Sequence, residues 1–140
     1  ISDGRLRTAD GNLGWRLDIW QDILFDLNET NKIFFGYGYN GIIPVMEWDN
    51  GYRLGLDGLN ENVHNNWFNI LARGGIFQLT LFVLLLFFIV RNCFKNSLNY
   101  NILIFITPIL FVSFFDSSME NSHFPILYYF FIGRELKSNN

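Results

Sequence analysis

Residues 63–90 decide the fold; they read VHNNWFNILARGG and then IFQLTLFVLLLFFIV. The part at 75–90 carries no charge and is somewhat shorter than the roughly 20 apolar residues of a typical membrane-spanning helix. Because the apolar pattern can extend backwards, we predict a transmembrane helix there. A short helix over 65–73 is predicted to precede it and to end at the glycine pair before Ile76. His64 therefore places possible proton chemistry at a membrane surface.

Two more apolar runs follow, at 98–115 and 124–133, and the shorter second run could make a third span, 117–133, together with the residues before it. Pro108 predicts a kink in the first, which membrane helices tolerate. Glu120 would lie within or near the membrane if the second is a span, and an acid there is a functional candidate by default. Outside the membrane, Glu120 would be an ordinary loop residue.

Charges at the ends of these runs indicate one orientation. Basic residues follow the first run, Arg91 and Lys95, and the third run, Arg134 and Lys137. Only acidic residues, Asp116 and Glu120, follow the second run. By the positive-inside rule, the ends of the first and third runs are cytoplasmic. Residues 1–73 then form an extracytoplasmic (periplasmic) loop region, and residues 74–140 form the transmembrane helices, their short loops and a cytoplasmic tail.

Composition agrees with a membrane protein and excludes several classes. Half of the 140 residues are hydrophobic, 19% are aromatic and only 16% are charged, which is too apolar and too rich in Phe for a typical soluble domain. The net charge of −3 gives no basic footprint for nucleic acid. Cys93 is the single cysteine, so an internal disulfide and a cysteine-based zinc site are excluded. Because the chain opens on Ile1, we expect it to be the C-terminal part of a longer protein.

The polar half contains one amphipathic pattern. Residues 1–13 have no periodicity and predict a loop, whereas 15–27 predict a helix. On a helical wheel one face is apolar: Ile19, Trp20, Ile23, Leu24 and Leu27. Three acids recur every four residues on the opposite side: Asp18, Asp22 and Asp26. Residues 31–62 are rich in Gly and Asn and predict irregular structure with short helical turns. The fold class predicted is all-α: a polytopic integral membrane fragment with a helical extracytoplasmic loop followed by two to three transmembrane helices.

Arg16 projects from the middle of that apolar face. An arginine there is costly unless it meets a partner. It could be a snorkelling or ion-paired structural residue. It could equally direct its fork of donors at a phosphate or carboxylate.

His64 stands just before a predicted helix, where the positive end of the helix dipole favours a neutral imidazole. A neutral imidazole can accept a proton, so a general-base role is chemically sensible, although a single histidine is more often structural. His123 is the only other histidine, and no carboxylate spacing supports a metal site. We therefore predict no metal.

The remaining charged residues of the polar half have weaker patterns. Four acids are interpreted as solvated surface: Glu47, Asp49, Asp57 and Glu61. Arg53 and Arg73 could contact an anionic substrate, and Arg73 is the better placed because it lies near the membrane boundary. The pair Gly36 and Gly38 lacks the strand-then-helix context of a phosphate loop and predicts a turn.

Several of these features occur together in one known family. The features are Arg-Leu-Asp-Ile-Trp at 16–20, Phe-Gly-Tyr-Gly at 35–38, His-Asn at 64–65, and Gly75, which opens an apolar span. Their order and spacing resemble the O-antigen ligase and O-antigen polymerase family. The resemblance covers roughly residues 13–90. Two positions depart from it: Gln78 stands where a second glycine is frequent, and Arg73 where an acid is common.

The resemblance implies a metal-independent, cofactor-free, inverting glycosyltransferase of the bacterial inner membrane. Its donor would be a glycan on an undecaprenyl-diphosphate carrier, and its acceptor a lipid-linked glycan or the lipid A-core. His64 would activate the acceptor hydroxyl and Arg16 would bind the diphosphate. Asn65, Trp20 and Arg73 are the candidate substrate-binding residues. Membrane lipid is an expected partner and nucleic acid is not.

Two other functions remain open. A transporter or membrane scaffold whose outer loop binds a partner would need Arg16 and His64 only for folding. A membrane-anchored hydrolase would depend on loop carboxylates instead, although no spacing supports a glycosidase pair. Polymerase and ligase activities are not separated by this part of the sequence.

Overall fold

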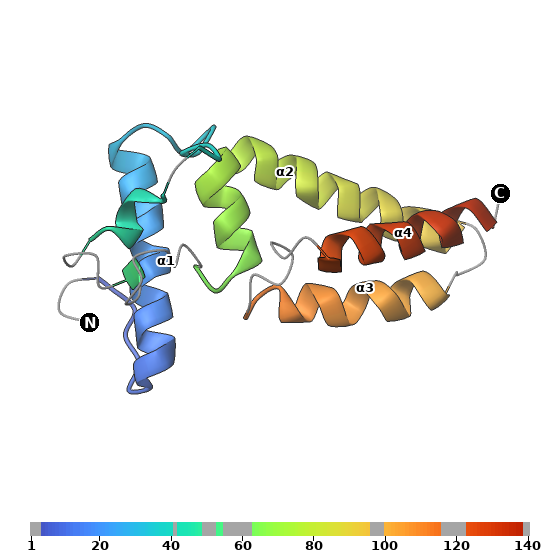
Figure 1. Ribbon diagram of the computed structural model, residues 1–140, viewed down its shortest axis with the longest axis horizontal. Coiled ribbons are helices and arrows are strands. Elements are labelled where there is room, and N and C mark those ends of the chain that lie inside the picture. The colour runs from blue at the N-terminus through green and yellow to red at the C-terminus, as the bar shows by residue number, and fades with distance from the viewer. Residues whose placement is uncertain are drawn as a thin grey trace.

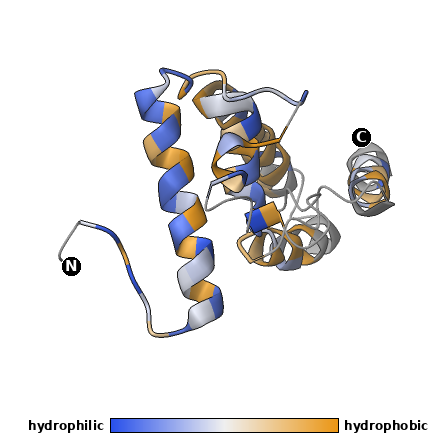
Figure 2. Ribbon diagram, turned by 60° about the vertical axis from the view of Figure 1, so that its left-hand side comes forward, coloured by the Kyte–Doolittle hydropathy of each residue, from blue (hydrophilic) through white to orange (hydrophobic). Residues whose placement is uncertain are grey.

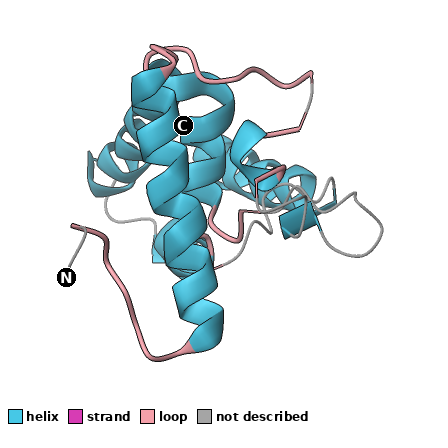
Figure 3. Ribbon diagram, turned by 90° about the vertical axis from the view of Figure 1, so that its left-hand side faces the viewer, coloured by secondary structure: helices cyan, strands magenta, loops and turns pink. Residues whose placement is uncertain are grey.

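The computed structural model describes residues 4–40, 42–48, 53–54, 63–95, 100–115 and 123–138. Within these ranges every regular element is a helix (Figure 3). The elements are α1 (Gly11–Glu29), the 3-10 helix η1 (Pro44–Met46), α2 (Asn66–Lys95), α3 (Tyr100–Val112) and α4 (His123–Ser138). The all-α class is therefore confirmed for the described residues.

Helix α1 begins earlier than its apolar pattern indicates. The Asp10 side chain accepts a hydrogen bond from the Leu13 amide at 2.7 Å, which is a standard N-cap. Residues 11–13, predicted to be loop, are therefore helical. At the other end the Thr30 amide and hydroxyl both bond to the Asp26 carbonyl, at 2.9 and 2.6 Å, and close the last turn.

The predicted division of α1 into an apolar and an acidic face is wrong at two positions. Asp22 is buried together with Ile19, Ile23 and Leu27, while Leu24 is exposed. Burial of the carboxylate follows from an ion pair with Arg53 (Nη2 to Oδ2, 2.7 Å), itself a buried residue. Helical periodicity shows only which residues share a face, and a long-range partner brought Asp22 into the core.

Helix α2 consists of two arms joined at a sharp break. Gly75 has φ 66° and ψ −168°, far from helical values, and Figure 1 shows the chain turning there. The first arm, 66–74, lies beside α1, and the second, 76–95, runs away with α3 and α4 (Figure 1). A short helix that ends at the glycine pair, followed by a longer apolar helix, agrees with the sequence prediction.

A loop at 33–38 forms backbone hydrogen bonds with both arms of α2 at the break. The Tyr37 and Gly38 amides donate to the Ala72 and Arg73 carbonyls at 2.7 and 2.9 Å. The Ile33 and Phe34 carbonyls accept from the amides of residues 76 and 77 at 2.9 and 3.1 Å. The loop thus satisfies backbone groups that a helix end leaves without partners.

The core of the first region lies between α1, η1 and the first arm of α2. Its residues come from all these elements and from the segment before α2: Ile19, Ile23, Leu27, Ile43, Val45, Met46, Leu54, Val63, Leu71 and Ala72. Figure 2 shows apolar positions of α1 alternating with polar ones along the helix. This core fixes α1 against the segment that carries His64.

The second region has a small core and an apolar exterior. Four buried residues connect its three helices: Ile89, Ile106, Tyr128 and Ile132. Most of the large side chains on these helices point outwards, among them Phe87, Phe111 and Phe130. One helix of the described chain, Asn66–Asn92 of α2, is long and apolar enough to cross a membrane. Such a surface suits contact with lipid or with further helices.

The helices of the second region differ in length from the predicted spans. The second arm of α2 continues to Lys95, beyond the predicted end at 90. Helix α3 has 13 residues and runs through Pro108. Helix α4 is described over 16 residues, His123–Ser138, and continues past Gly133 through Arg134, whereas the predicted start at 117 lies outside the described residues. Glu120 lies outside the described residues.

Candidate functional site

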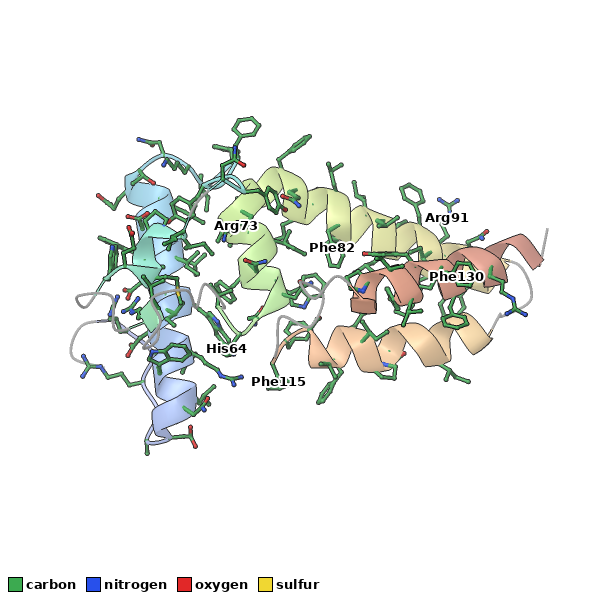
Figure 4. All side chains as sticks on the ribbon, viewed as in Figure 1. His64, Arg73, Phe82, Arg91, Phe115 and Phe130 are labelled. Carbon is green, nitrogen blue, oxygen red and sulfur yellow. The ribbon has the colours of Figure 1, made fainter. Side chains whose placement is uncertain are left out.

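Three segments far apart in the sequence meet beside the start of α2. They are the beginning of α1, residues 63–66, and residues 113–115 at the end of α3. Figure 4 shows His64 and Phe115 near the same end of the first arm of α2. The structure thus brings Arg16, His64 and Asn65, three of the predicted site residues, into one place.

His64 is held in an unusual backbone conformation. Its φ of 52° lies in the left-handed region, which few residues other than glycine adopt, although histidine is among the more tolerant. The imidazole contacts the Trp15 ring edge to face, with centroids 5.3 Å apart and an interplanar angle of 62°. His64 is half-buried. The neighbouring turn and the tryptophan ring together determine where the imidazole lies.

Arg16 follows Trp15 on α1 and reaches the end of α3. Its Nη1 donates to the Phe115 carbonyl at 2.8 Å. Its Nε is buried and has no hydrogen-bond partner among the described residues. A buried guanidinium N–H without an acceptor is costly, and such groups frequently mark the position of a ligand or water.

The two asparagines after His64 have different bonding. The Asn65 Oδ1 accepts from the amides of Trp67 and Phe68 at 2.9 and 3.1 Å, so it caps α2. Its Nδ2 donates to the Phe114 carbonyl at 3.0 Å. Asn66 is also buried, but within the ranges that the structure describes its Nδ2 has no hydrogen-bond partner. Asn66 was not among the predicted site residues, because an asparagine at a helix start is common.

Three successive carbonyls after α3 are bonded by this site. The Ser113 carbonyl accepts from the Asn66 amide at 2.9 Å. The Phe114 carbonyl accepts from the Asn65 side chain, and the Phe115 carbonyl accepts from Arg16. The Ser113 hydroxyl also accepts from Trp67 Nε1 at 3.0 Å. Nothing in the sequence of 113–115 signals this role, because backbone carbonyls carry no residue-specific pattern.

Trp20 connects α1 to the histidine segment. Its indole N–H donates to the Val63 carbonyl at 2.7 Å, and its ring stacks on Phe68 with centroids 5.2 Å apart. The indole donor predicted for substrate is thus bound within the protein. Its contact nevertheless fixes the residue that precedes His64.

Arg73 lies away from the other candidates. It is at the opposite end of the first arm of α2 (Figure 4), separated from Asn66 by about 10 Å of helix axis. Its Nη1 donates to the Gly38 carbonyl at 3.3 Å. The structure therefore places Arg73 at the helix break, apart from Arg16 and His64.

Two further acids of α1 bind polar groups from the loops. Asp22 bonds to both Arg53 and Arg5, and Arg53 Nη1 also donates to the Val45 carbonyl at 3.1 Å. Arg53, considered above as a substrate contact, is thus part of the core. Asp26 accepts from the Tyr37 hydroxyl at 2.5 Å. Burial of the Tyr37 hydroxyl raises its pKa above the ordinary value, because the charged phenolate would lose contact with water. The hydrogen bond to the Asp26 carboxylate and the negative charge of that carboxylate raise the pKa further.

One of the four loop acids interpreted as solvated surface lies in the described part of the chain. Glu47 is exposed, as expected, whereas Asp49, Asp57 and Glu61 lie outside the described residues, and so do the side chains of Cys93 and His123. Among the side chains that are described, no three of His, Cys, Asp or Glu gather where a metal ion could bind. Comparison of the chain with protein-family models, curated proteins and solved structures finds no match.

Proposed function

We propose that this chain belongs to a membrane glycosyltransferase that moves a glycan from an undecaprenyl-diphosphate carrier to a lipid-linked or lipid A-core acceptor. The proposal rests on the resemblance of residues 13–90 to the O-antigen ligase and polymerase family. One structural observation supports it most: a half-buried histidine in the left-handed region packs on Trp15, and Arg16, the next residue of α1, has a buried Nε with no hydrogen-bond partner in the described part of the chain. Backbone strain of this kind gathers at functional sites.

The proposed reaction is a direct displacement at the anomeric carbon. His64 accepts the proton of the acceptor hydroxyl, and that oxygen forms the new glycosidic bond from the side opposite the diphosphate. The old bond breaks with its electron pair going to the diphosphate. Arg16 stabilises the negative charge that develops on this leaving group. Inversion at the anomeric carbon follows from the single displacement.

Buried donors around the site fit a negatively charged leaving group. Arg16 Nε and Asn66 Nδ2 both lack hydrogen-bond partners in the part of the chain that the structure describes, and both residues bond to carbonyls of 113–115. Charge-assisted hydrogen bonds to phosphate oxygens are among the strong ones. The long apolar arm of α2 that follows would hold the site near the surface of a membrane, where a lipid-linked donor resides.

A scaffold or transporter is the second candidate, and specific contacts favour it. The side-chain polar groups of Asn65 and Trp20 are bound within the protein. Arg16 Nη1 likewise bonds to a backbone carbonyl. In that case Arg16 connects α1 to the segment after α3 and His64 packs on Trp15 of α1, and changing them would matter only through the amount of folded protein.

The discriminating experiment replaces His64 with Asn in the gene of the native host. Asparagine tolerates a positive φ, so the backbone is kept while the base is lost. A second variant, Arg16→Lys, keeps the charge but loses the planar fork. Surface glycans and lipid-linked intermediates are separated on a gel, with protein level in the membrane measured alongside.

Loss of polymer at normal protein level supports the transferase. Single repeats on the lipid core then indicate a polymerase, and stranded lipid-linked polymer indicates a ligase. An unchanged glycan profile in both variants contradicts the proposed mechanism and favours the scaffold.

A further inference from the structure

An apolar patch surrounds the break between the two arms of α2. Figure 1 shows the 33–38 loop beside the turn at Gly75, and the rings of Phe35 and Phe77 lie together there, with centroids 6.2 Å apart. Phe35 is 76% exposed, more than any other large apolar side chain in the described ranges. The exposed apolar residues of the loop, of the position after it and of the first turn of the second arm form the break patch: Phe34, Phe35, Tyr39, Ile76 and Phe77.

The backbone fixes the exposure of this patch. Hydrogen bonds connect the 33–38 loop to both arms of α2. A Cβ on Gly36 would lie 2.5 Å from the Ala72 carbonyl oxygen, so only a glycine lets the loop approach the first arm this closely. Phe34 and Phe35 come directly before that glycine, and their exposed rings are therefore carried by a bonded loop. Exposed apolar patches of this kind mark contact with a membrane or another protein.

The break patch continues along the second arm of α2. From the first turn onwards, exposed apolar residues recur three or four positions apart, which places them on one face of the helix: Phe77, Leu81, Leu84, Leu85 and Phe88. This face belongs to the helix of the described chain that is long and apolar enough to cross a membrane. A bilayer that surrounds the second arm would also meet the patch, because the two surfaces are continuous.

Polar groups that adjoin the break patch are bonded within the protein. Gln78 lies among the apolar residues of the second arm, and its Nε2 donates to the Tyr39 hydroxyl. The amides of Ile76 and Phe77, which begin the second arm, are bonded to loop carbonyls. Backbone groups in lipid must find their partners within the protein. These groups have such partners, so the break is suited to an apolar environment.

The charges near the patch suit a lipid surface. Between Glu29 and Glu47 the sequence has one charged residue, Lys32. Lys32 is exposed, and its Nζ lies 5.5 Å from the centroid of the Tyr37 ring. A lysine beside an apolar surface can lay its stem on that surface and direct its charge to lipid phosphates. Aromatic side chains are enriched at the same level of a membrane.

We propose that the break patch lies in the boundary between the headgroups and the acyl chains of a lipid bilayer. The 33–38 loop is then a second membrane contact of this chain, separate in sequence from the spanning arm. Gly75 lies at the level of the boundary. Leu85 lies about 15 Å farther along the arm, near the middle of a hydrocarbon core about 30 Å thick. The inference requires a bilayer around the second arm and does not rest on transferase activity.

Quenching of fluorescence by lipids tests this placement on the full chain. Cys93, the single cysteine, is replaced by Ser, and Phe35→Cys is then labelled with bimane. The protein is placed in vesicles of phosphatidylethanolamine and phosphatidylglycerol. A doxyl group on the lipid acts as quencher, either near the headgroup or deep in the acyl chain. We expect the label at position 35 to lose emission mainly to the shallow quencher.

Two further labelled positions serve as controls. Leu85→Cys, on the exposed face of the second arm, is expected to lose more emission to the deep quencher. Leu6→Cys is expected to lose none to either quencher. Leu6 is also an exposed apolar residue, but residues 4–10 lie on the side of α1 away from α2, α3 and α4 (Figure 2).

Three results would overturn the proposal. One is equal quenching at positions 35 and 6. Another is a label at 35 that is unquenched but blue-shifted, because a protein segment and not lipid then covers the patch. The third is absence of quenching at 85, because the bilayer around the second arm is then missing. His64→Asn is expected to change none of these signals, so failure here is distinguishable from failure of the proposed transferase.

Discussion

The two halves of this molecule bury their side chains in opposite ways. Around α1 and the first arm of α2, apolar residues point inwards and polar residues join the segments, as with Asp22 and Arg53. Around the second arm of α2, α3 and α4, few residues are buried and large aromatic side chains point outwards. The first half has an apolar core that its helices and loops enclose. The second has the surface of helices that need an apolar environment or further helices around them.

The boundary between the halves is the break at Gly75. There the 33–38 loop bonds to both arms of α2, and the first arm remains with the core while the second leaves it. The candidate site at His64 lies at the far end of the first arm, on the organised side. The contrast teaches that polar connections position the site, whereas the apolar side chains on the exterior of the second half contribute neither the ring contact of His64 nor the hydrogen bond of Arg16.

The largest effect is expected at the break itself. A Cβ on Gly75 would lie 2.3 Å from the Phe34 carbonyl carbon, and φ is +66°. Backbone atoms of the bonded loop cannot move aside, so Gly75→Ala should destabilise the first half by about 4 kcal/mol or more. Chemical unfolding of the purified protein measures this. Gly133→Ala is the control, because its Cβ meets nothing within 4 Å; equal stability of the two variants would contradict the role of the break.

The next effect concerns the buried ion pair. Asp22→Ala leaves Arg53 buried without its carboxylate, which should cost about 3–5 kcal/mol. The double variant Asp22→Leu with Arg53→Met should recover most of that loss, since a buried pair can be replaced by apolar groups. Glu29→Ala, at an exposed position of α1, is the control and should change little. The same unfolding experiment decides, and an unaffected Asp22→Ala protein would refute the importance of this pair.

A third substitution tests the outer surface of the second half. Phe87 is 56% exposed on α2, and Phe25 is 60% exposed on α1. If only the former faces lipid, Phe87→Lys should disfavour membrane insertion by roughly 2.5–3.5 kcal/mol, and Phe25→Lys should not. Resistance of the membrane-bound protein to alkaline extraction reports insertion. Equal extraction of both variants would mean that the exposed face of α2 does not meet lipid.

The smallest effect is a dependence on pH. The folded state raises the pKa of Tyr37 above its ordinary value of 10.0, so the folded protein holds this proton more tightly than the unfolded chain does. Its contribution to stability is complete below about pH 10 and is lost as pH rises further. Tyr37→Phe should remove about 1 kcal/mol at neutral pH and flatten the decline above pH 10.

Unfolding midpoints at several alkaline pH values measure that decline. Tyr39→Phe serves as the control because Tyr39 is exposed, and it should leave the decline in place. A decline that persists unchanged in Tyr37→Phe would assign it to another group.

Local patterns predicted much of the secondary structure. The apolar spacing of 15–27 indicated α1, and the uncharged run after the glycine pair indicated the second arm of α2. The first turn of α1 was missed because its signal is a single capping acid, Asp10, and not an apolar repeat.

The candidate site was predictable in part. Arg16 and His64 were selected by residue type and by resemblance, and they proved to lie together. Asn66 and the carbonyls of 113–115 were not selected, since their contribution depends on which backbone groups meet in space. Arg73 was expected near substrate because it is close in sequence to the apolar run, but one arm of helix separates it from His64.

The sequence alone determined that this chain is helical, that it divides into a polar and an apolar half, and that the helix after His64 breaks at a glycine pair. These properties follow from nearest neighbours and short periodicities, which act within a few turns of chain. Tertiary structure alone decided that Asp22 is buried, that the 33–38 loop bonds to both arms of α2 across the break, and that Arg16 donates a hydrogen bond to the Phe115 carbonyl after α3. Each of these depends on partners between 31 and 99 residues apart, and no local pattern records which distant groups meet.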